Sequence, residues 1–282
     1  MLTFLFTILF FNSCQNDDEP IVPTNETIDK GHEEWSKVTF SFRKGHLHGS
    51  QFHGDPESQA KYLKVKQEIS FVTDEKGNVK MESEAPVRFI KDAFYALEIT
   101  YYNKKGEMIN GEFVTPQMAP LHQHFFLSKD VKDINTGASI SNKNNLEYTY
   151  RDTNPWDRNI KENGVKLRLV NDPIGFKGYF KVIGQHQIFD LNVILIHVIN
   201  GSKLSDNGIP YAFNNPSPRI LGVQDLNLKL PVRIFSRHPE TDLETENYIK
   251  DIAKEFNISY EEAEIDVQNS WDVDPESSSY YM

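Results

Sequence analysis

In the stretch Val38-Thr39-Phe40-Ser41-Phe42-Arg43-Lys44-Gly45-His46-Leu47-His48, the apolar residues Val38, Phe40 and Phe42 alternate with the polar residues Thr39, Ser41 and Arg43. Alternation with a period of two is typical of a half-buried β-strand. The parity of Val38, Phe40 and Phe42 continues at Lys44, His46 and His48, so we expect one strand face to carry core residues first and histidines at its end. Gly45 leaves open a β-bulge that would shift this parity.

Histidines are concentrated in two short windows of the chain. His46 and His48 are followed by His53, and a second His-x-His pair lies at His122 and His124, so five of the nine histidines fall in these windows. On an extended strand, a His-x-His pair places both imidazoles on one face, about 6.5–7 Å apart. Two such pairs on neighbouring strands could converge on one point. We therefore expect a single shared transition-metal site near one end of the fold.

Imidazole is a good ligand for zinc and copper, and the expected cofactor is a zinc or copper ion, with haem as a variant. Asp55 and Glu57 are candidate partners that would orient the imidazoles, and Met118 is a candidate soft ligand for copper. The alternative is that the histidines are surface or capping residues in loops. His197 is expected to be a hydrogen-bonded core residue and His32 a solvated one.

The composition indicates a β-rich globular protein. Aromatic residues make up 12% of the 282 residues, and 15 Gly and 14 Pro separate short apolar runs. The expected fold is mainly β, a β-sandwich (Ig-like or related, one large or two small). Its first β region spans 35–145 and carries the histidine cluster, and its second spans 146–238. A strand is expected from Met108 to Val114, and the long strand Phe189–Val198 is expected to be central.

The C-terminal segment 239–282 differs in charge and periodicity. Apolar residues at helical spacing around Ile252, and the pair Ser259 and Glu262, predict two short helices. From Glu240 onward, thirteen acidic residues against two lysines give a net charge of −11, which equals that of the whole chain. The remainder is therefore neutral and shows no basic patch for nucleic-acid binding. Residues from Trp271 onward are expected to fray.

The N-terminus has the pattern of an exported protein. Met1–Asn12 is almost wholly apolar, too short for a membrane span, and precedes the single cysteine, Cys14, and an acidic stretch. This pattern resembles the lipobox and export signal of Bacteroidetes-type outer-membrane surface lipoproteins. The resemblance implies a signal peptide at 1–14, lipidation of Cys14 and a cell-surface location on the outer membrane. Residues 15–34 are polar, acidic and proline-bearing, which predicts a flexible tether. A plain secretory signal with an incidental cysteine is the alternative.

These features together predict a cell-surface lipoprotein that binds a transition metal or a metal-containing ligand such as haem. The metal ligands are expected to be His46, His48, His53, His122 and His124. Uptake through an outer-membrane transporter is the expected context. The first alternative is a glycan- or partner-binding lipoprotein with structural histidines, and the second is a metallo-enzyme. The sequence contains no Gly-x-Ser-x-Gly, phosphate-loop or His-Glu-x-x-His motif, which argues against those enzyme classes.

Overall fold

The computed structural model describes residues 30–82, 86–141, 144–199 and 202–282. The predicted signal peptide, with Cys14, and most of the predicted tether lie outside these residues. Within them, no helix is both long enough and apolar enough to cross a membrane.

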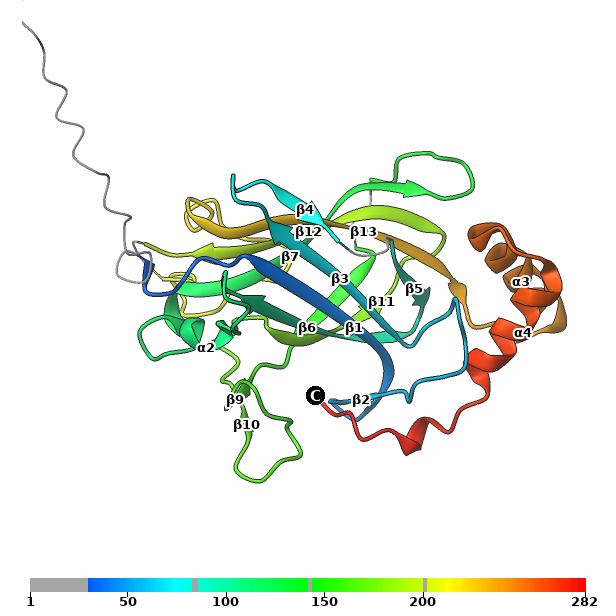
Figure 1. Cartoon of the computed structure of the whole chain (residues 1–282), viewed down its shortest axis with the longest axis horizontal. Coiled ribbons are helices and arrows are strands. Elements are labelled where there is room, and N and C mark those ends of the chain that lie inside the picture. Colours follow the sequence, from blue (N-terminus) through cyan, green and yellow to red (C-terminus); the bar gives the residue numbers. More distant parts are fainter. Residues whose placement is uncertain (1–29, 83–85, 142–143, 200–201) are drawn as a thin grey trace, which may run out of the picture.

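Two β-sheets pack face to face (Figure 1). The larger sheet has the order β4 (Val79–Met81), β3 (Lys66–Thr73), β1 (Lys37–His48), β6 (Phe94–Tyr102), β11 (Lys177–Val182), β8 (Leu146–Tyr150), and β2 (Gln51–Gly54) pairs with β1. The smaller sheet has the order β5 (Val87–Lys91), β13 (Gln224–Arg237), β12 (Gln187–His197), β7 (His122–Asp133). Strands β9 (Thr153–Asn154) and β10 (Lys166–Leu167) form a separate pair.

A single apolar core lies between the two sheets. Buried side chains of the larger sheet, such as Phe40 and Phe180, belong to the same cluster as Phe89, Leu191 and Val232 of the smaller one. The mainly β, sandwich-like fold is thus confirmed. Both sheets contain strands from 35–145 and from 146–238, so the two regions build this core together.

Strand β1 lies inside the larger sheet, between β3 and β6. Val38, Phe40 and Phe42 are fully buried, as the alternation predicts. The pairing of β1 with β6 continues without a register shift to Gly45, opposite Phe94, so there is no bulge and the parity carries through to the histidines. A Cβ atom at Gly45 would lie 2.2 Å from the carbonyl oxygen of His53, which explains why glycine is needed where β2 approaches.

The strand expected from Met108 to Val114 is wrong, because a short helix, α2 (Asn110–Phe113), occupies this segment. The side chain of Asn110 accepts a hydrogen bond from the backbone N–H of Tyr101 (2.7 Å) and donates one to the carbonyl of Ile99 (2.8 Å). A single side chain therefore binds backbone groups of β6 that a pairing strand would otherwise bind.

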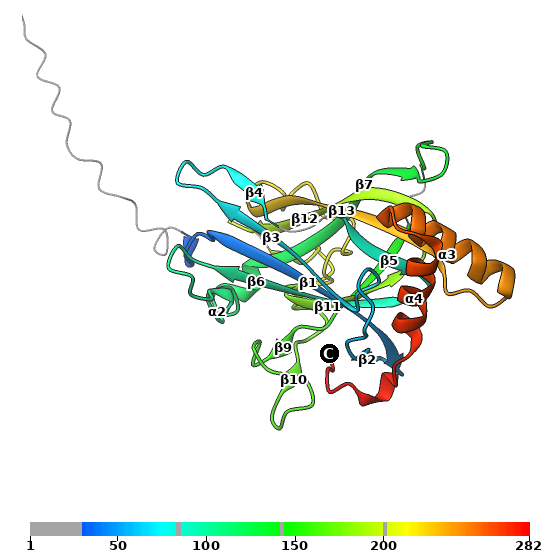
Figure 2. The same cartoon turned by 45° about the vertical axis from the view of Figure 1, so that its right-hand side comes forward.

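The expected helical hairpin is confirmed and lies at one end of the sandwich (Figure 2). Helix α3 (Asp242–Phe256) begins with a capping box formed by Thr241 and Glu244, and α4 (Tyr260–Trp271) begins at Ser259, whose side chain accepts from the N–H of Glu262. Buried residues of both helices pack against Phe235 at the end of β13. Hydrophobic contact with the sheet therefore holds the acidic helices in place.

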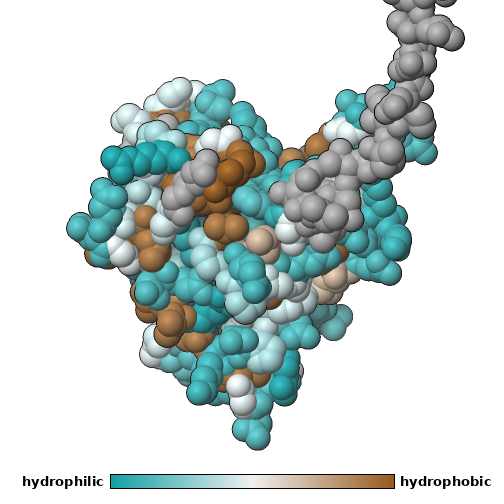
Figure 3. Space-filling model, turned by 90° about the vertical axis from the view of Figure 1, so that its left-hand side faces the viewer, coloured by the Kyte–Doolittle hydropathy of each residue, from teal (hydrophilic) through white to brown (hydrophobic). Residues whose placement is uncertain are grey.

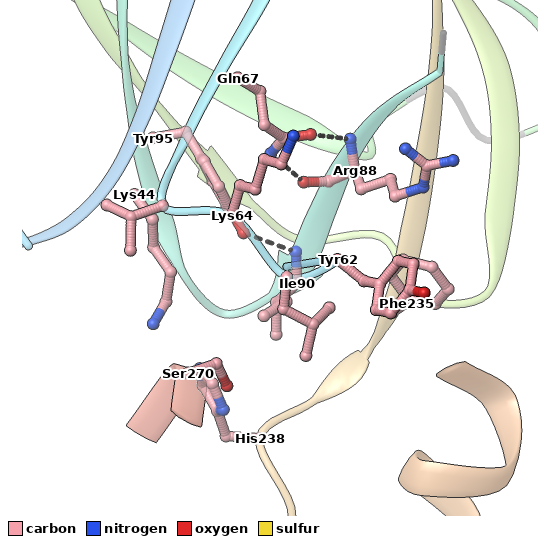
Figure 4. A pocket seen from close by; sticks show the side chains of 12 residues that line it. Lys44, Tyr62, Lys64, Gln67, Arg88, Ile90, Tyr95, Phe235, His238 and Ser270 are labelled. Carbon is pink, nitrogen blue, oxygen red and sulfur yellow. Dashed lines mark hydrogen bonds between the residues drawn. The ribbon is translucent and has the colours of Figure 1, made fainter. Parts of the chain in front are cut away.

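A small cavity lies where the ends of both sheets meet helix α4 (Figure 4). Its lining includes Lys44, Tyr95 and His238, and the Tyr95 hydroxyl accepts a hydrogen bond from the backbone N–H of Ile90 at 3.1 Å. The Nε1–H of Trp271, the last residue of α4, donates to Nδ1 of His238 at 3.2 Å. His238 thus connects the end of the sheet to the helices through a nitrogen that must stay unprotonated.

The last residues are ordered against β2, which corrects the expectation that they fray. After the short 3-10 helix η2 (Pro275–Ser277), the chain pairs with β2. Phe52 exchanges two backbone hydrogen bonds with Met282, each 3.1 Å long, and the N–H of Gly54 donates to the carbonyl of Tyr280 at 3.0 Å. Met282 is buried. The C-terminal segment thus acts as a further strand beside the histidine hairpin.

The start of β1 lies at the opposite end of the sandwich from the helices (Figure 1), and Figure 3 looks onto that end. Its visible surface is mainly hydrophilic, with separate hydrophobic patches. This distribution agrees with a fold whose apolar strand faces are buried between the two sheets.

Candidate metal centre

Three of the predicted ligands lie on one face of the β1–β2 hairpin. His46 and His48 are two residues apart on β1, and His53 of β2 is the direct antiparallel partner of His46. The turn between the strands includes Gly49, whose φ of 63° suits glycine. Uninterrupted strand parity and a tight turn are therefore sufficient to bring the three imidazoles together.

Their nitrogens are spaced like the ligands of one metal ion. Nε2 of His48 lies 3.2 Å from Nε2 of His46 and 3.2 Å from Nδ1 of His53. The carboxylate of Glu276, in η2, lies 3.4 Å from the nitrogen of His46, 3.5 Å from that of His48 and 3.9 Å from that of His53. Bonds of 2.0–2.1 Å in a tetrahedral zinc site separate ligand atoms by about 3.3–3.4 Å. These four residues, here called the hairpin site, fit such an ion.

Hydrogen bonds on the outer side orient two of the rings. Nε2 of His53 lies 2.8 Å from the carbonyl oxygen of Ser278, so it carries the hydrogen and donates it. Nδ1 of His46 likewise donates to Oδ1 of Asp55 at 3.1 Å. The nitrogens that face the centre are then unprotonated and able to bind a metal. Tyr281 stacks on His53, with ring centroids 4.4 Å apart and an interplanar angle of 4°.

The hairpin site is accessible to solvent on one side. The side chain of His53 is fully buried, whereas those of His46, His48 and Glu276 are 32%, 46% and 62% exposed. His46 also lines an open groove of about 720 Å³ that runs toward Trp271. An ion held here could therefore enter and leave without unfolding of the sandwich.

Of the two carboxylates predicted to orient the imidazoles, only one contacts a histidine of the hairpin site. Asp55 contacts His46 as expected and also pairs with Nζ of Lys44 at 3.2 Å. Glu57 instead pairs with Arg43 at 3.4 Å, and its side chain is 70% exposed. Asp55, which lies opposite the end of β1, is thus the carboxylate that orients a ligand.

His122 lies in a different cluster, so the expectation of one shared site is wrong. It begins β7 and is the direct partner of His197 at the end of β12. Nε2 of His122 lies 3.1 Å from Nδ1 of His197 and 3.2 Å from Oδ2 of Asp225, and His32 reaches the same carboxylate. These four residues, here called the buried cluster, are the second group able to hold a metal ion.

His124 belongs to neither cluster. It is fully buried, receives a hydrogen bond from the Tyr101 hydroxyl (2.8 Å) and donates one to the carbonyl of Ile174 (2.8 Å). Burial lowers the pKa of His124 to about 3, which keeps its ring neutral. Both nitrogens are thus occupied, and His124 is a core residue. Tyr101 is itself fully buried.

Strand direction explains why the two windows do not meet. Tyr101, the partner of His124, pairs with Val38 at the start of β1, whereas the hairpin site lies beyond Gly45 at its end. Seven residues of extended strand cover roughly 23 Å. The two histidine windows therefore lie toward opposite ends of the sandwich.

Four further members of these clusters, His32, His197, Glu276 and Asp225, were not predicted as ligands. His197 was expected to be a hydrogen-bonded core residue, and it is buried as a member of the buried cluster. His32 was expected to be solvated but is buried, because it packs against Phe113. Glu276 and Asp225 carry no local sequence signal that distinguishes them from other acidic residues. Comparison of the chain with protein-family models, with curated proteins and with solved structures gives no match.

Proposed function

We propose that the protein binds a transition-metal ion reversibly at the hairpin site and passes it on. The observation that supports this most directly is the convergence of three imidazole nitrogens, two pairs of them 3.2 Å apart, next to the Glu276 carboxylate. The outer hydrogen bonds of His46 and His53 leave metal-binding lone pairs facing the centre. Exposure of His48 and Glu276 favours exchange with solvent over a permanent structural role.

The ligand set favours zinc or copper over haem. Three imidazoles and one carboxylate suit either ion. Iron in a porphyrin binds axial imidazoles only on its two opposite faces. Three nitrogens that converge on one point match a bare ion better.

The arrangement also favours binding over catalysis. Glu276 fills the fourth position of a tetrahedral site, and Asp55 is engaged by His46 and Lys44. A catalytic zinc site keeps one position for water or substrate. We therefore place metal binding ahead of a metallo-enzyme function.

The proposed setting is the outer face of a bacterial outer membrane. Lipidation at Cys14 would anchor the chain, and an outer-membrane transporter would receive the metal. This part of the proposal is supported by the sequence pattern at residues 1–19 alone. The solvent-exposed side of the hairpin site is compatible with transfer to a partner.

The test is a metal titration of the purified chain and two variants. Zinc and copper(I) are titrated separately in competition with a chromophoric chelator, into wild type, His48→Ala and His186→Asn. His186 lies outside both clusters and has a φ of 49°, which asparagine tolerates, so it is a matched control. We expect His48→Ala to lose the exchangeable metal ion and His186→Asn to keep it. Equal binding by wild type and His48→Ala, or no exchangeable metal in wild type, would refute the proposal. Retention on immobilised glycans by a metal-free protein would favour the glycan-binding alternative.

A further inference from the structure

The buried cluster is assembled by strand register and by one irregularity in the smaller sheet. His122 and His197 are direct partners on β7 and β12. In the pairing of β12 with β13, Leu195 lies opposite Leu226 and Ile196 opposite Gln224, so Asp225 is the extra residue of a bulge. Bulges commonly redirect a side chain. Here the bulge accompanies a carboxylate placed beside the histidine pair.

The atoms of the cluster have the spacing of a coordination sphere. Oδ2 of Asp225 lies 3.0 Å from Nε2 of His32, 3.2 Å from Nε2 of His122 and 3.2 Å from Nδ1 of His197. Nδ1 of His197 lies 3.1 Å from His122 and 3.4 Å from His32. These separations are close to the 3.3–3.4 Å or so expected around tetrahedral zinc.

The hydrogen-bond pattern favours a cation at the centre of the cluster. Nδ1 of His32 lies 2.9 Å from the carbonyl oxygen of Glu33, and Nδ1 of His122 lies 2.8 Å from that of Met118. Carbonyl oxygens only accept, so both Nδ1 atoms carry hydrogens, and each ring, when neutral, directs an Nε2 lone pair at Asp225. A carboxylate oxygen also only accepts. Lone pairs facing one another at this distance repel unless a cation lies between them, either a proton on one of the nitrogens or a metal ion bound by all of them.

The second carboxylate oxygen points to the same conclusion. Oδ1 of Asp225 is buried and has no hydrogen-bond partner among the residues that the structure describes. A buried carboxylate without full hydrogen bonding is costly unless a positive charge compensates it. A divalent ion would neutralise the carboxylate and bind the imidazole lone pairs.

Packing closes the cluster to solvent. The side chains of His32, His122 and Asp225 are no more than 3% exposed, and that of His197 is 10% exposed. The ring of Phe113 lies 4.2 Å from that of His32 and 5.1 Å from that of His122. An ion held here would exchange slowly, unlike one in the hairpin site.

We propose that His32, His122, His197 and Asp225 hold a permanent structural divalent metal ion, zinc by preference, that fastens the segment before β1 to the smaller sheet. His32 is the only member outside the sheets, so the ion would join residues 30–34 to β7, β12 and β13. Trp35 adds a second link, because its Nε1–H donates to the carbonyl of Asp225 at 2.7 Å. This proposal goes beyond metal exchange at the hairpin site and does not depend on it.

The test compares the purified full chain with Asp225→Asn and His48→Ala. Each protein is saturated with zinc and dialysed against a mild chelator that removes exchangeable metal. Bound zinc is measured by mass spectrometry and thermal unfolding by circular dichroism. The amide of Asp225→Asn keeps the side-chain shape and can donate to the imidazoles, so a cluster held by hydrogen bonds alone would tolerate it, whereas a metal site would not. His48→Ala leaves the buried cluster intact.

We expect one zinc to remain in wild type and in His48→Ala and none in Asp225→Asn. Forced removal with a strong chelator under mildly denaturing conditions should lower the Tm of wild type and of His48→Ala by about 5–10 °C, with no effect on Asp225→Asn. If Asp225→Asn does not fold, His32→Gln, which changes a residue outside the sheets, provides the same comparison. Retention of zinc by the cluster variant, absence of retained zinc in His48→Ala, or an unchanged Tm after removal would overturn the proposal.

Discussion

Replacing Glu276 with glutamine tests whether the C-terminal segment and the metal are energetically coupled. In the structure the Glu276 carboxylate lies 3.4 Å and 3.5 Å from the nitrogens of His46 and His48. The segment that carries it is otherwise held by backbone hydrogen bonds to β2, by the hydrogen bond from His53 to the carbonyl of Ser278 and by the buried side chain of Met282. A bound ion would therefore contact two parts of the protein that can separate.

Zinc binding and closure of the C-terminal segment must strengthen each other by the same factor. If the closed segment raises zinc affinity by a given factor, saturating zinc must favour the closed segment by the same factor. Couplings of this kind are typically about 5- to 150-fold, and we expect about tenfold, or 1.4 kcal/mol, because Glu276 is one ligand of four and is largely exposed. Glu276→Gln should therefore bind zinc about tenfold more weakly.

Hydrogen exchange supplies the second half of the measurement. Amides of residues 278–282 should exchange about tenfold more slowly when zinc saturates the wild-type protein, and should change little in Glu276→Gln. Titration calorimetry on both proteins gives the affinity ratio. Equal zinc protection in both proteins, or a tenfold affinity loss without any zinc protection in wild type, would refute the coordination of the ion by Glu276.

Three further predictions concern the hairpin site, the protonation of His238 and the packing of α3. Asp55→Asn should weaken metal binding at the hairpin site by about 10- to 100-fold in a chelator competition, whereas Glu57→Gln, which contacts no histidine of the site, should leave it unchanged. Burial, followed by nearby positive charge, lowers the pKa of His238 to about 4, so the unfolded chain binds more protons between about pH 6.5 and 4. Stability should therefore fall as the pH drops through this range, by at most about 2 kcal/mol at pH 5, and urea unfolding of His238→Gln should show a flatter pH dependence. Ile252→Ala, at a fully buried position of α3, should cost about 2–5 kcal/mol in urea unfolding, and Ile265→Ala, at a position 54% exposed, well under half of that.

The features that could be predicted from the sequence are those determined within a few residues. Alternation from Val38 to Phe42 fixes one face of β1, and the absence of a bulge at Gly45 carries that parity to His46 and His48. The turn at Gly49 then returns His53 to the same face. Three of the four hairpin-site residues thus lie in one eight-residue window, where local strand geometry is sufficient to bring them together.

The features that could not be predicted depend on sheet order and on contacts between distant parts of the chain. His122 has the same local spacing to His124 as His46 has to His48, but β7 belongs to the other sheet and its histidines lie near the start of β1. Nothing near Glu276 indicates that η2 would reach β2. The sequence neighbours of His32 are polar and predict a solvated side chain. Its burial could not be predicted locally, because the ring that packs against it belongs to Phe113 of the distant helix α2.

The two clusters share one construction, and burial alone separates their proposed roles. Each uses an antiparallel histidine pair in direct register, His46 with His53 and His122 with His197, and each adds a carboxylate from outside regular pairing. In the hairpin site the Glu276 carboxylate lies on an exposed segment, so this carboxylate can leave a bound ion after only a local opening of the C-terminal segment. In the buried cluster every ligand is packed in the core, so ion release requires opening of the segment before β1 or of the sheet itself. Because release rates depend on these opening free energies, the same ligand chemistry should give an exchangeable ion at one end of the sandwich and a retained one at the other.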